Sequence, residues 1–281
     1  MLKSKWILIT GCSTGIGLDA ALSLHSRGYS VIASVKKPED IAVLRDKGLP
    51  HVIHLDLRSS ESIDTAIEQT MALCGGQLFA LFNNGAYGQP GAVEDLSRLA
   101  LQKQFETNVF GTHELTVKLL PHMCDEDARI IQNSSILGFL AMPMRGAYNA
   151  SKFALEGLSD TLRIELSETN TKVILIEPGP ILTNFRENAL QALEANVDFS
   201  KSRFQKQYQG ALFRLRKAGP ASRFTLGPEA VTKALVHALE SKCPKPRYRV
   251  TFPTKLFACI SPFLPTRILD RILVAIAQSN R

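Results

Sequence analysis

The chain contains, near its N-terminus, the stretch Trp6-Ile7-Leu8-Ile9-Thr10-Gly11-Cys12-Ser13-Thr14-Gly15-Ile16-Gly17. Its first four residues are apolar and predict a short buried strand, and residues 18–24 have the apolar spacing of a helix. Glycines in such a turn let the backbone approach a pyrophosphate, and the N-terminus of the helix presents free N–H groups to it. The glycine spacing, Gly-x-x-x-Gly-x-Gly, differs from the Gly-x-Gly-x-x-Gly fingerprint. The stretch predicts a dinucleotide-binding turn.

The rest of the chain alternates strand-like and helical segments. We expect strands at 6–10, 29–35, 51–55, 78–82, 129–134, 172–177 and 247–251. This pattern predicts an α/β fold with a single doubly wound, Rossmann-type parallel sheet and helices on both faces. The 281 residues, 45% of them hydrophobic, suit one domain. We divide it into a core for cofactor binding and catalysis (1–180), a substrate lid (181–226) and a C-terminal extension (240–281).

A tyrosine and a lysine stand four residues apart in Tyr148-Asn-Ala-Ser-Lys152. A helix, supported by the apolar spacing of residues 151–166, would place both side chains on one face. A free tyrosine titrates near pH ~10, too high for acid–base catalysis at neutral pH. A cation ~5 Å away is worth roughly 3 kcal/mol, or about two pKa units. The spacing therefore predicts that Lys152 lowers the pKa of Tyr148.

A serine pair follows the apolar run at 129–133. A hydroxyl at the carboxyl end of a strand lies where open α/β sheets bind ligands, and it can donate to a carbonyl oxygen. Ser135 and Ser134 are both candidates for this role.

These motifs, taken in order, resemble those of the short-chain dehydrogenase/reductase family over about residues 5 to 185. The matching positions are Thr10 to Gly17, Asp56, Asn83-Asn84-Gly85, Asn108, Ser135, Tyr148, Lys152 and Pro178-Gly179. One departure is Asn83-Asn84-Gly85-Ala86, where the family more often has Asn-Asn-Ala-Gly. Beyond Thr183 the resemblance becomes weak, but family members that carry a C-terminal extension include the retinol dehydrogenase-like and 17β-hydroxysteroid dehydrogenase-like branches, and bacterial aldehyde reductases of the family look similar too.

The resemblance implies a role for each matching residue. Tyr148 is the acid/base, Lys152 tunes it and holds the ribose, and Ser135, rather than Ser134, polarises the carbonyl. Asn108 anchors a water in a proton relay to Lys152; its alternative role is hydrogen bonding to a helix backbone. Asp56 contacts the adenine, and Thr183 contacts the nicotinamide amide. The expected cofactor-binding residues are Gly11, Ser13, Thr14, Gly15, Ile16, Gly17, Lys36, Lys37, Asp56, Leu57, Asn84, Gly85, Asn108, Tyr148, Lys152, Pro178, Gly179 and Thr183.

The choice between NAD and NADP is made at the end of the second strand. An NAD enzyme places an acid there to bind the ribose 2′-OH. This chain has Val35 at that position, followed by Lys36 and Lys37. No carboxylate then opposes a 2′-phosphate, and two cations can bind it. The sequence predicts NADP(H), with a solvated lysine pair as the alternative.

The charge is concentrated in the last third of the chain. Residues 201–281 contain 16 Lys or Arg and 3 Asp or Glu, whereas the whole chain has a net charge of +7. This excess indicates either an anionic partner or a solubilising face. We expect no nucleic-acid binding, because no known module is present. The five scattered cysteines suit a reducing compartment, with Cys12 a small buried thiol, and no metal site is expected.

The lid and the extension suggest the kind of substrate. The lid is rich in large apolar residues, which suggests a hydrophobic aldehyde or ketone; packing of the lid onto the body is the alternative. Its apolar residues are Leu190, Leu193, Val197, Phe199, Phe204, Tyr208, Leu212 and Phe213, and the facing wall is expected to include Leu137, Phe139, Met142 and Met144. An amphipathic helix at 267–277 could contact a membrane, the pocket or another subunit.

The sequence predicts an NADP(H)-dependent oxidoreductase that interconverts a carbonyl and an alcohol. The alternatives are a non-catalytic NADP(H)-binding sensor or scaffold, a β-ketoacyl thioester reductase and, more weakly, a sugar-nucleotide epimerase. Family members suggest a homodimer or homotetramer. We expect no signal peptide or membrane span, and therefore a cytoplasmic protein, with peripheral membrane contact through the extension as an open alternative.

Overall fold

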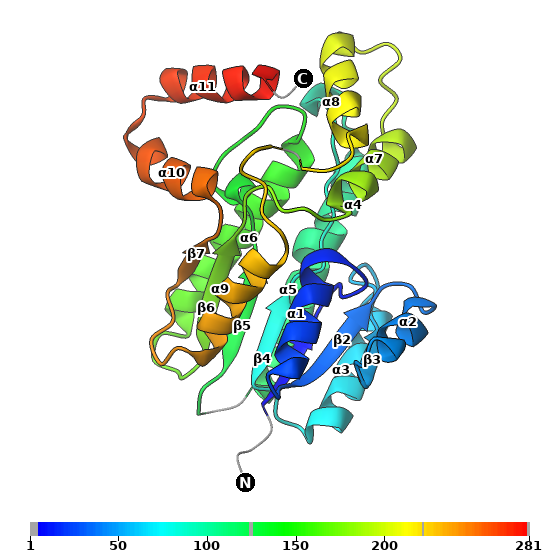
Figure 1. Cartoon of the computed structure of the whole chain (residues 1–281), viewed down its shortest axis with the longest axis vertical. Helices are drawn as coiled ribbons and strands as arrows, with labels where there is room; N and C mark the ends of the chain where they lie inside the picture. Colours follow the sequence, from blue (N-terminus) through cyan, green and yellow to red (C-terminus); the bar gives the residue numbers. More distant parts are fainter. Residues whose placement is uncertain (1–4, 124–125, 221, 280–281) are drawn as a thin grey trace.

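The computed structural model describes residues 5–123, 126–220 and 222–279. Its centre is a seven-stranded sheet with the strand order β3-β2-β1-β4-β5-β6-β7 (Figure 1), and all neighbouring strands are parallel. The strands are β1 (Trp6–Ile9), β2 (Ser30–Val35), β3 (His51–His54), β4 (Ala80–Asn83), β5 (Arg129–Asn133), β6 (Lys172–Glu177) and β7 (Arg247–Arg249). All seven predicted strands and the predicted fold class are confirmed.

Helices cover both faces of this sheet. The central strands are apolar at consecutive positions, as expected for a sheet buried on both faces, and Ile7, Leu8 and Ile9 are fully buried. One core layer packs α1 (Gly15–Ser26), α2 (Asp40–Asp46) and α9 (Glu229–Glu240) against the sheet. The other packs α3 (Ser60–Cys74), α5 (Thr112–Leu119) and the end of α6 (Gly146–Glu165).

The order of the strands reverses beside β1, which pairs with β2 on one side and β4 on the other. In sheets of this type, ligands bind at the carboxyl ends of the strands beside such a reversal. Between β4 and β5 the chain forms η1 (Val93–Asp95), α4 (Arg98–Phe105), the π-helix η2 (Glu106–Gly111), α5 and η3 (Leu120–His122). After β5 comes the single turn η4 (Ile136–Gly138).

Two helical additions lie beyond the carboxyl ends of the strands (Figure 1). The lid contains α7 (Phe185–Asn196) and α8 (Gln205–Arg216). The C-terminal extension contains α10 (Phe252–Ile260), η5 (Ser261–Phe263) and α11 (Thr266–Ser279). Within the described ranges, every helix is too short or too polar to cross a bilayer.

Candidate active site

The glycine turn joins β1 to α1 and has no room for side chains. Gly11 and Gly15 have φ angles of 70° and 60°, in the left-handed region that favours glycine. A Cβ atom on Gly17 would lie 2.7 Å from Asn84 Nδ2 and still closer to the carbonyl oxygen of Gly11. The N-cap Thr14 makes no side-chain hydrogen bond to the start of α1, which leaves the N–H groups of that first turn for a ligand. The turn therefore fits the pyrophosphate of a dinucleotide.

Asn84 holds this turn to the neighbouring strands. Its Nδ2 atom donates to the carbonyl oxygens of Thr10 (2.9 Å) and Gly11 (3.2 Å), and its Oδ1 accepts from Asn133 Nδ2 at 2.9 Å. Thr10 Oγ1 accepts from the backbone N–H groups of both Asn84 (2.9 Å) and Gly85 (2.7 Å). The exchanged order Gly85-Ala86 is compatible with this junction, because it is the backbone of Gly85 that binds Thr10.

The expected adenosine end of the site contains one more cation than the sequence indicated. Arg58 donates to Asp56 through Nη2 (2.7 Å) and Nε (3.1 Å), and Lys36 Nζ lies 4.0 Å from Asp56 Oδ2. The position after β2 carries no carboxylate, as the sequence shows, but the loop after β3 brings the carboxylate of Asp56 to Lys36. Lys36, Lys37 and Arg58 are nevertheless exposed and outnumber this one carboxylate. The sequence signal that could have identified Arg58 as part of the site is its position two residues after Asp56, which was expected to contact the adenine.

The two serines after β5 point to different surroundings. Ser135 Oγ accepts from Leu137 N at 3.1 Å and hydrogen-bonds with Tyr148, which places it beside the tyrosine. Ser134 Oγ is buried without a partner among the described residues and lies near Gly138. The backbone N–H of Ile136 donates to the carbonyl of Pro178 at 2.8 Å and so holds the turn η4 to the end of β6.

Tyr148 and Lys152 share one face of α6, as predicted, but the predicted pKa of the tyrosine was wrong. Burial raises the pKa of Tyr148 to about 12, and the hydrogen bond with Ser135 and the charge of Arg145 only partly oppose this. Lys152 Nζ lies 5.8 Å from the centre of the tyrosine ring and donates instead to the Asn133 carbonyl at 2.7 Å. Without a bound cofactor, the loss of hydration around the Tyr148 hydroxyl raises its pKa by more than a nearby positive charge lowers it.

Burial also lowers the pKa of Lys152, to about 8, and the carboxylate of Glu156 acts against this shift. Glu156 is buried one helical turn after Lys152. Its Oε2 accepts from Arg247 Nη2 at 3.0 Å, and Arg247 Nε donates to the fully buried Glu177 at 2.9 Å. This link from α6 to β7 was missed by sequence reasoning, because it joins residues about 90 positions apart.

Asn108 lies inside the π-helix η2, a type of distortion common at functional sites. Its Nδ2 donates to the Tyr87 carbonyl (3.0 Å) and to Ser151 Oγ (3.2 Å), and its Oδ1 accepts from Tyr87 N (3.1 Å). Asn108 thus fixes the loop after β4 beside α6. The alternative role of binding a helix backbone was wrong, because Tyr87 belongs to that loop. A Cβ atom at Gly111 would collide with the carbonyl oxygen of Leu57, so glycine is needed where η2 meets that backbone.

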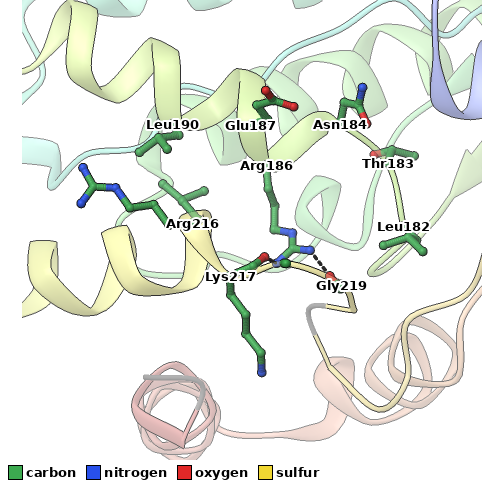
Figure 2. A pocket seen from close by; sticks show the side chains of 11 residues that line it. Leu182, Thr183, Asn184, Arg186, Glu187, Leu190, Arg216, Lys217 and Gly219 are labelled. Carbon is green, nitrogen blue, oxygen red and sulfur yellow. Dashed lines mark hydrogen bonds between the residues drawn. The ribbon is translucent and has the colours of Figure 1, made fainter.

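Thr183 lies over the glycine turn. A Cβ atom on Gly15 would meet the Thr183 side chain at 3.0 Å, and Thr183 Oγ1 accepts from Phe185 N at 3.3 Å. Thr183 also borders an open pocket of about 490 Å³ between the start of α7 and the end of α8 (Figure 2). Gly179, just upstream, packs against Thr251 and Thr254 at the start of α10.

The apolar residues of the lid mostly pack against one another. They form one cluster with Ala92 and Met144 of the body, whose lid members are Ala189, Leu190, Leu193, Val197, Phe199, Phe204, Tyr208, Leu212 and Leu215. The prediction that these residues line the substrate space was therefore wrong for most of them. Phe185 and Phe213 remain exposed, and the Phe185 ring lies 5.4 Å from that of Tyr148.

The C-terminal extension packs on the segment that follows Ser135. Phe257 of α10 and Leu273 of α11 are buried against Leu140, with Ile136, Phe139 and Met142 at the edge of this cluster. The residues expected to face the lid across the substrate space are therefore divided. Met144 packs against the lid, whereas Phe139 and Met142 pack against the extension. The helix expected at 267–277 therefore packs on the segment after Ser135 of its own chain.

The comparisons with known proteins agree with this geometry. The family model described as short chain dehydrogenase matches residues 5–194. The chain belongs to the short-chain dehydrogenase family. It is 42% identical over 273 residues to the uncharacterized oxidoreductase YbbO of Escherichia coli K12, covering 97% of this chain and 95% of that one.

Two further proteins show how far the likeness extends. An NADPH-dependent 3-dehydrocapnine reductase of Ornithobacterium rhinotracheale is 31% identical over 277 residues, with 95% of each chain covered. A short-chain dehydrogenase/reductase from Burkholderia phymatum, solved with NAD, has a TM-score of 0.77 at 23% identity and covers 93% of this chain and 94% of that one. This short-chain dehydrogenase is therefore an oxidoreductase on a fold that binds a nicotinamide cofactor.

The arrangement supplies the groups needed for proton transfer next to a hydride donor. A nicotinamide cofactor, when bound, supplies or accepts the hydride. Tyr148 can give its hydroxyl proton to a substrate oxygen, and Ser135 can donate a hydrogen bond to the same atom. A charged Lys152 stabilises the tyrosinate that remains.

The remaining reactive groups lie outside this chemistry. Cys12 is fully buried, its Sγ donates to the Ile9 carbonyl at 3.1 Å, and burial raises its pKa to about 12. It is an inert buried thiol, as the sequence predicted. Cys124 lies outside the described residues. Among the residues that are described, His, Cys, Asp and Glu form no group suited to a metal ion.

Proposed function

We propose that this short-chain dehydrogenase is an NADP(H)-dependent enzyme that interconverts an aldehyde or ketone and its alcohol. The observation that carries the proposal is the convergence of Ser135, Tyr148 and Lys152 beside a glycine turn without room for side chains. A protein that only bound the cofactor would have no need of this acid–base set.

The proposed acid–base step depends on the charge of Lys152. In the reduction, Tyr148 donates its proton to the oxygen of the carbonyl group while Ser135 holds that oxygen. Lys152 must be protonated to stabilise the tyrosinate, and Glu156 favours its charged form. Asn108 supports the site by fixing Tyr87 and Ser151, and we propose that it also holds a water that returns the proton by way of Lys152.

The preference for NADP(H) is supported by charge. Lys36, Lys37 and Arg58 are exposed at the end of the site expected to hold the adenosine, and Asp56 is the carboxylate among them. A 2′-phosphate would find charge-assisted donors there. The relative from Ornithobacterium rhinotracheale is described as NADPH-dependent, which agrees with this choice.

We propose an apolar carbonyl substrate, such as a medium- or long-chain aldehyde. Support comes from apolar side chains that stay exposed around Tyr148 and on the lid: Phe185 lies against the tyrosine ring, and Leu182 and Phe213 are also exposed. The C-terminal cluster on residues 136–142 would close the other side of this space.

The test is NADPH and NADH oxidation at 340 nm with medium- and long-chain aldehydes, retinal, a 17-ketosteroid and a β-ketoacyl thioester. The proposal expects turnover of apolar aldehydes with NADPH and its loss in Tyr148→Phe. A β-ketoacyl thioester as the best substrate would replace the proposed substrate class. Tight NADPH binding without any turnover would favour a sensor. A preference for NADH would reject the proposal that Lys36, Lys37 and Arg58 bind the 2′-phosphate.

We also propose how the protein associates. Exposed apolar residues of α4, η2, α5 and α6 suit a homodimer or homotetramer, and they include Leu99, Leu101, Phe110, Val117, Phe153, Leu158 and Ile164. The protein is proposed to be cytoplasmic. Peripheral membrane contact is proposed through the extension, where Phe263 is 85% exposed and Arg267 and Arg271 are exposed nearby.

A further inference from the structure

The segment 133–138, which follows β5, contacts three successive turns of α6. Tyr148 hydrogen-bonds with Ser135 of the segment. One turn along the helix, Lys152 Nζ donates to the first backbone carbonyl of the segment at 2.7 Å. One turn further, the buried Glu156 packs against the glycine at the end of the segment. The first two contacts take part in the proposed reaction, and the third lies on the same face of the helix.

Two buried oxygen atoms beside Gly138 have no hydrogen-bond partner among the described residues. They are Ser134 Oγ and Glu156 Oε1, and the two residues are 3% and 7% exposed. A Cβ atom on Gly138 would lie 2.6 Å from the first oxygen and 2.9 Å from the second. The two oxygens can therefore be no farther apart than the sum of these distances, which one water can bridge. A buried polar group without a partner is costly, and here a hydroxyl donor and a carboxylate acceptor lie on either side of one glycine.

The other carboxylate oxygen of Glu156 is bound from β7. Its Oε2 accepts from Arg247 Nη2 at 3.0 Å, and Arg247 gives further hydrogen bonds to Asp160 (2.7 Å) and to the buried Glu177 (2.9 Å). A carboxylate that served only to neutralise an arginine would gain most from using both oxygens in a bidentate pair. Here one oxygen is left for the turn at Gly138, and the bond from Arg247 fixes the direction in which it points.

Backbone hydrogen bonds hold this turn to the end of β6. The N–H of Ser134 donates to the carbonyl of Ile176 at 2.8 Å, and the N–H of Ile136 donates to the carbonyl of Pro178 at 2.8 Å. Ser135 Oγ accepts from a backbone N–H two residues further on, so this hydroxyl moves with the turn. A hydrogen bond from the Ser134 hydroxyl to α6 would fix the turn to that helix as well, and with it the distance from Ser135 to the tyrosine.

We infer that Ser134 and Glu156 are positioning residues, joined across Gly138 by a hydrogen bond or by one bridging water. Together they hold the turn that carries Ser135 against α6, so that the Ser135 hydroxyl meets the same substrate oxygen as Tyr148. Ser134, the second serine considered for the carbonyl, thus acts through Ser135 and not on the substrate. This inference rests on the proposed carbonyl–alcohol activity and adds two residues to it.

The test is a double-mutant cycle on the single turnover of bound NADPH with dodecanal. Ser134→Ala should slow hydride transfer roughly tenfold, the loss expected for one hydrogen bond to a charged group, with the Kd for NADPH unchanged. In the Ser135→Ala background the same substitution should slow the reaction less than about twofold, because the hydroxyl that Ser134 positions is gone. A purely structural serine would cost the same in both backgrounds.

A second cycle tests the carboxylate. Glu156→Gln keeps the shape of the side chain and removes its charge, so Ser134→Ala should cost less in this background than in the wild type. The rates are measured at about pH 6, below the pKa of about 8 of Lys152. Ser159→Ala is the matched control on α6, since this serine is 1% exposed and its Oγ donates to the Leu155 carbonyl at 2.6 Å. The control should lower the Tm and keep the wild-type rate of hydride transfer.

Four results would overturn the inference. Hydride transfer at the wild-type rate in Ser134→Ala would show that its hydroxyl has no part in the reaction. An equal loss in the Ser135→Ala background would show that Ser134 does not act through Ser135. An equal loss in the Glu156→Gln background would exclude the carboxylate as its partner. No reduction of any carbonyl compound by the wild type would reject the proposed activity itself and this inference with it.

Discussion

A methyl group at Gly17 is expected to disable the cofactor site. In Gly17→Ala the new Cβ would lie 2.7 Å from Asn84 Nδ2 and 2.9 Å from the carbonyl carbon of Gly11. Both distances are far shorter than carbon contacts of about 3.5 Å or more. The backbone of Gly11 has to move, and the hydrogen bonds from Asn84 to Thr10 and Gly11 are broken or stretched.

The cost follows from these contacts. Overpacking typically costs about 1–3 kcal/mol, and each lost hydrogen bond adds about 1 kcal/mol. The better helix propensity of alanine returns up to about 1 kcal/mol. The net destabilisation of about 2–4 kcal/mol corresponds to a Tm lowered by roughly 5–15 °C for a domain of this size. Loss of one hydrogen bond from the displaced turn to the pyrophosphate, worth about 1.5–3 kcal/mol, should weaken NADPH binding roughly tenfold to a hundredfold.

Thermal unfolding and fluorescence titration with NADPH measure both effects. The control is Gly157→Ala in α6, where an added Cβ would meet nothing within 4 Å. That variant should be unchanged or stabilised by up to about 1 kcal/mol and should bind NADPH normally. A Gly17→Ala protein with wild-type Tm and wild-type NADPH affinity would refute the reasoning.

Three further predictions concern charge and packing. Because Lys152 must be charged, kcat/KM for NADPH should fall as pH rises through about 8; Glu156→Gln should move this midpoint lower, whereas Asp160→Asn should not. Lys36→Glu should lower kcat/KM with NADPH at least about tenfold and affect NADH little, since the lysine is 57% exposed beside the expected 2′-phosphate. Leu273→Asp should detach α11 and raise KM for dodecanal more than for butanal, whereas the exposed Val274→Asp should behave as wild type.

Each of these predictions has an outcome that contradicts it. An unmoved pH midpoint in Glu156→Gln would mean that the carboxylate does not act on Lys152. Parallel losses with both cofactors in Lys36→Glu would indicate damage to the fold, which circular dichroism would reveal. Equal KM changes for both aldehydes in Leu273→Asp would show that α11 does not border the space that binds the substrate.

Local patterns in the sequence were sufficient to predict the sheet. Each strand is a short apolar run bounded by turn residues, and parallel strands buried on both faces need no more than that. The positions of the glycine turn and of the pair Tyr148 and Lys152 also followed from spacing, because helix geometry places residues four apart on one face.

Contacts between distant segments could not be predicted in this way. Arg247 reaches Glu156 and Glu177 only because β7 pairs with β6, and the sequence does not state that register. The pKa of Tyr148 was misjudged for a related reason: spacing gives the position of a cation, whereas burial depends on everything packed around the ring. The apolar lid residues were misassigned because a sequence does not distinguish a self-packed cluster from the wall of a pocket.

The measurement that tests the central claim most directly is a single turnover of bound NADPH with dodecanal, in the wild type and in Tyr148→Phe. The variant keeps the ring that packs against Phe185 and removes the hydroxyl that carries the proton. The account predicts an unchanged Kd for NADPH and a hydride-transfer rate reduced by a factor on the order of 100 to 10,000. Hydride transfer in Tyr148→Phe at the wild-type rate would contradict the assignment of Tyr148 as the acid.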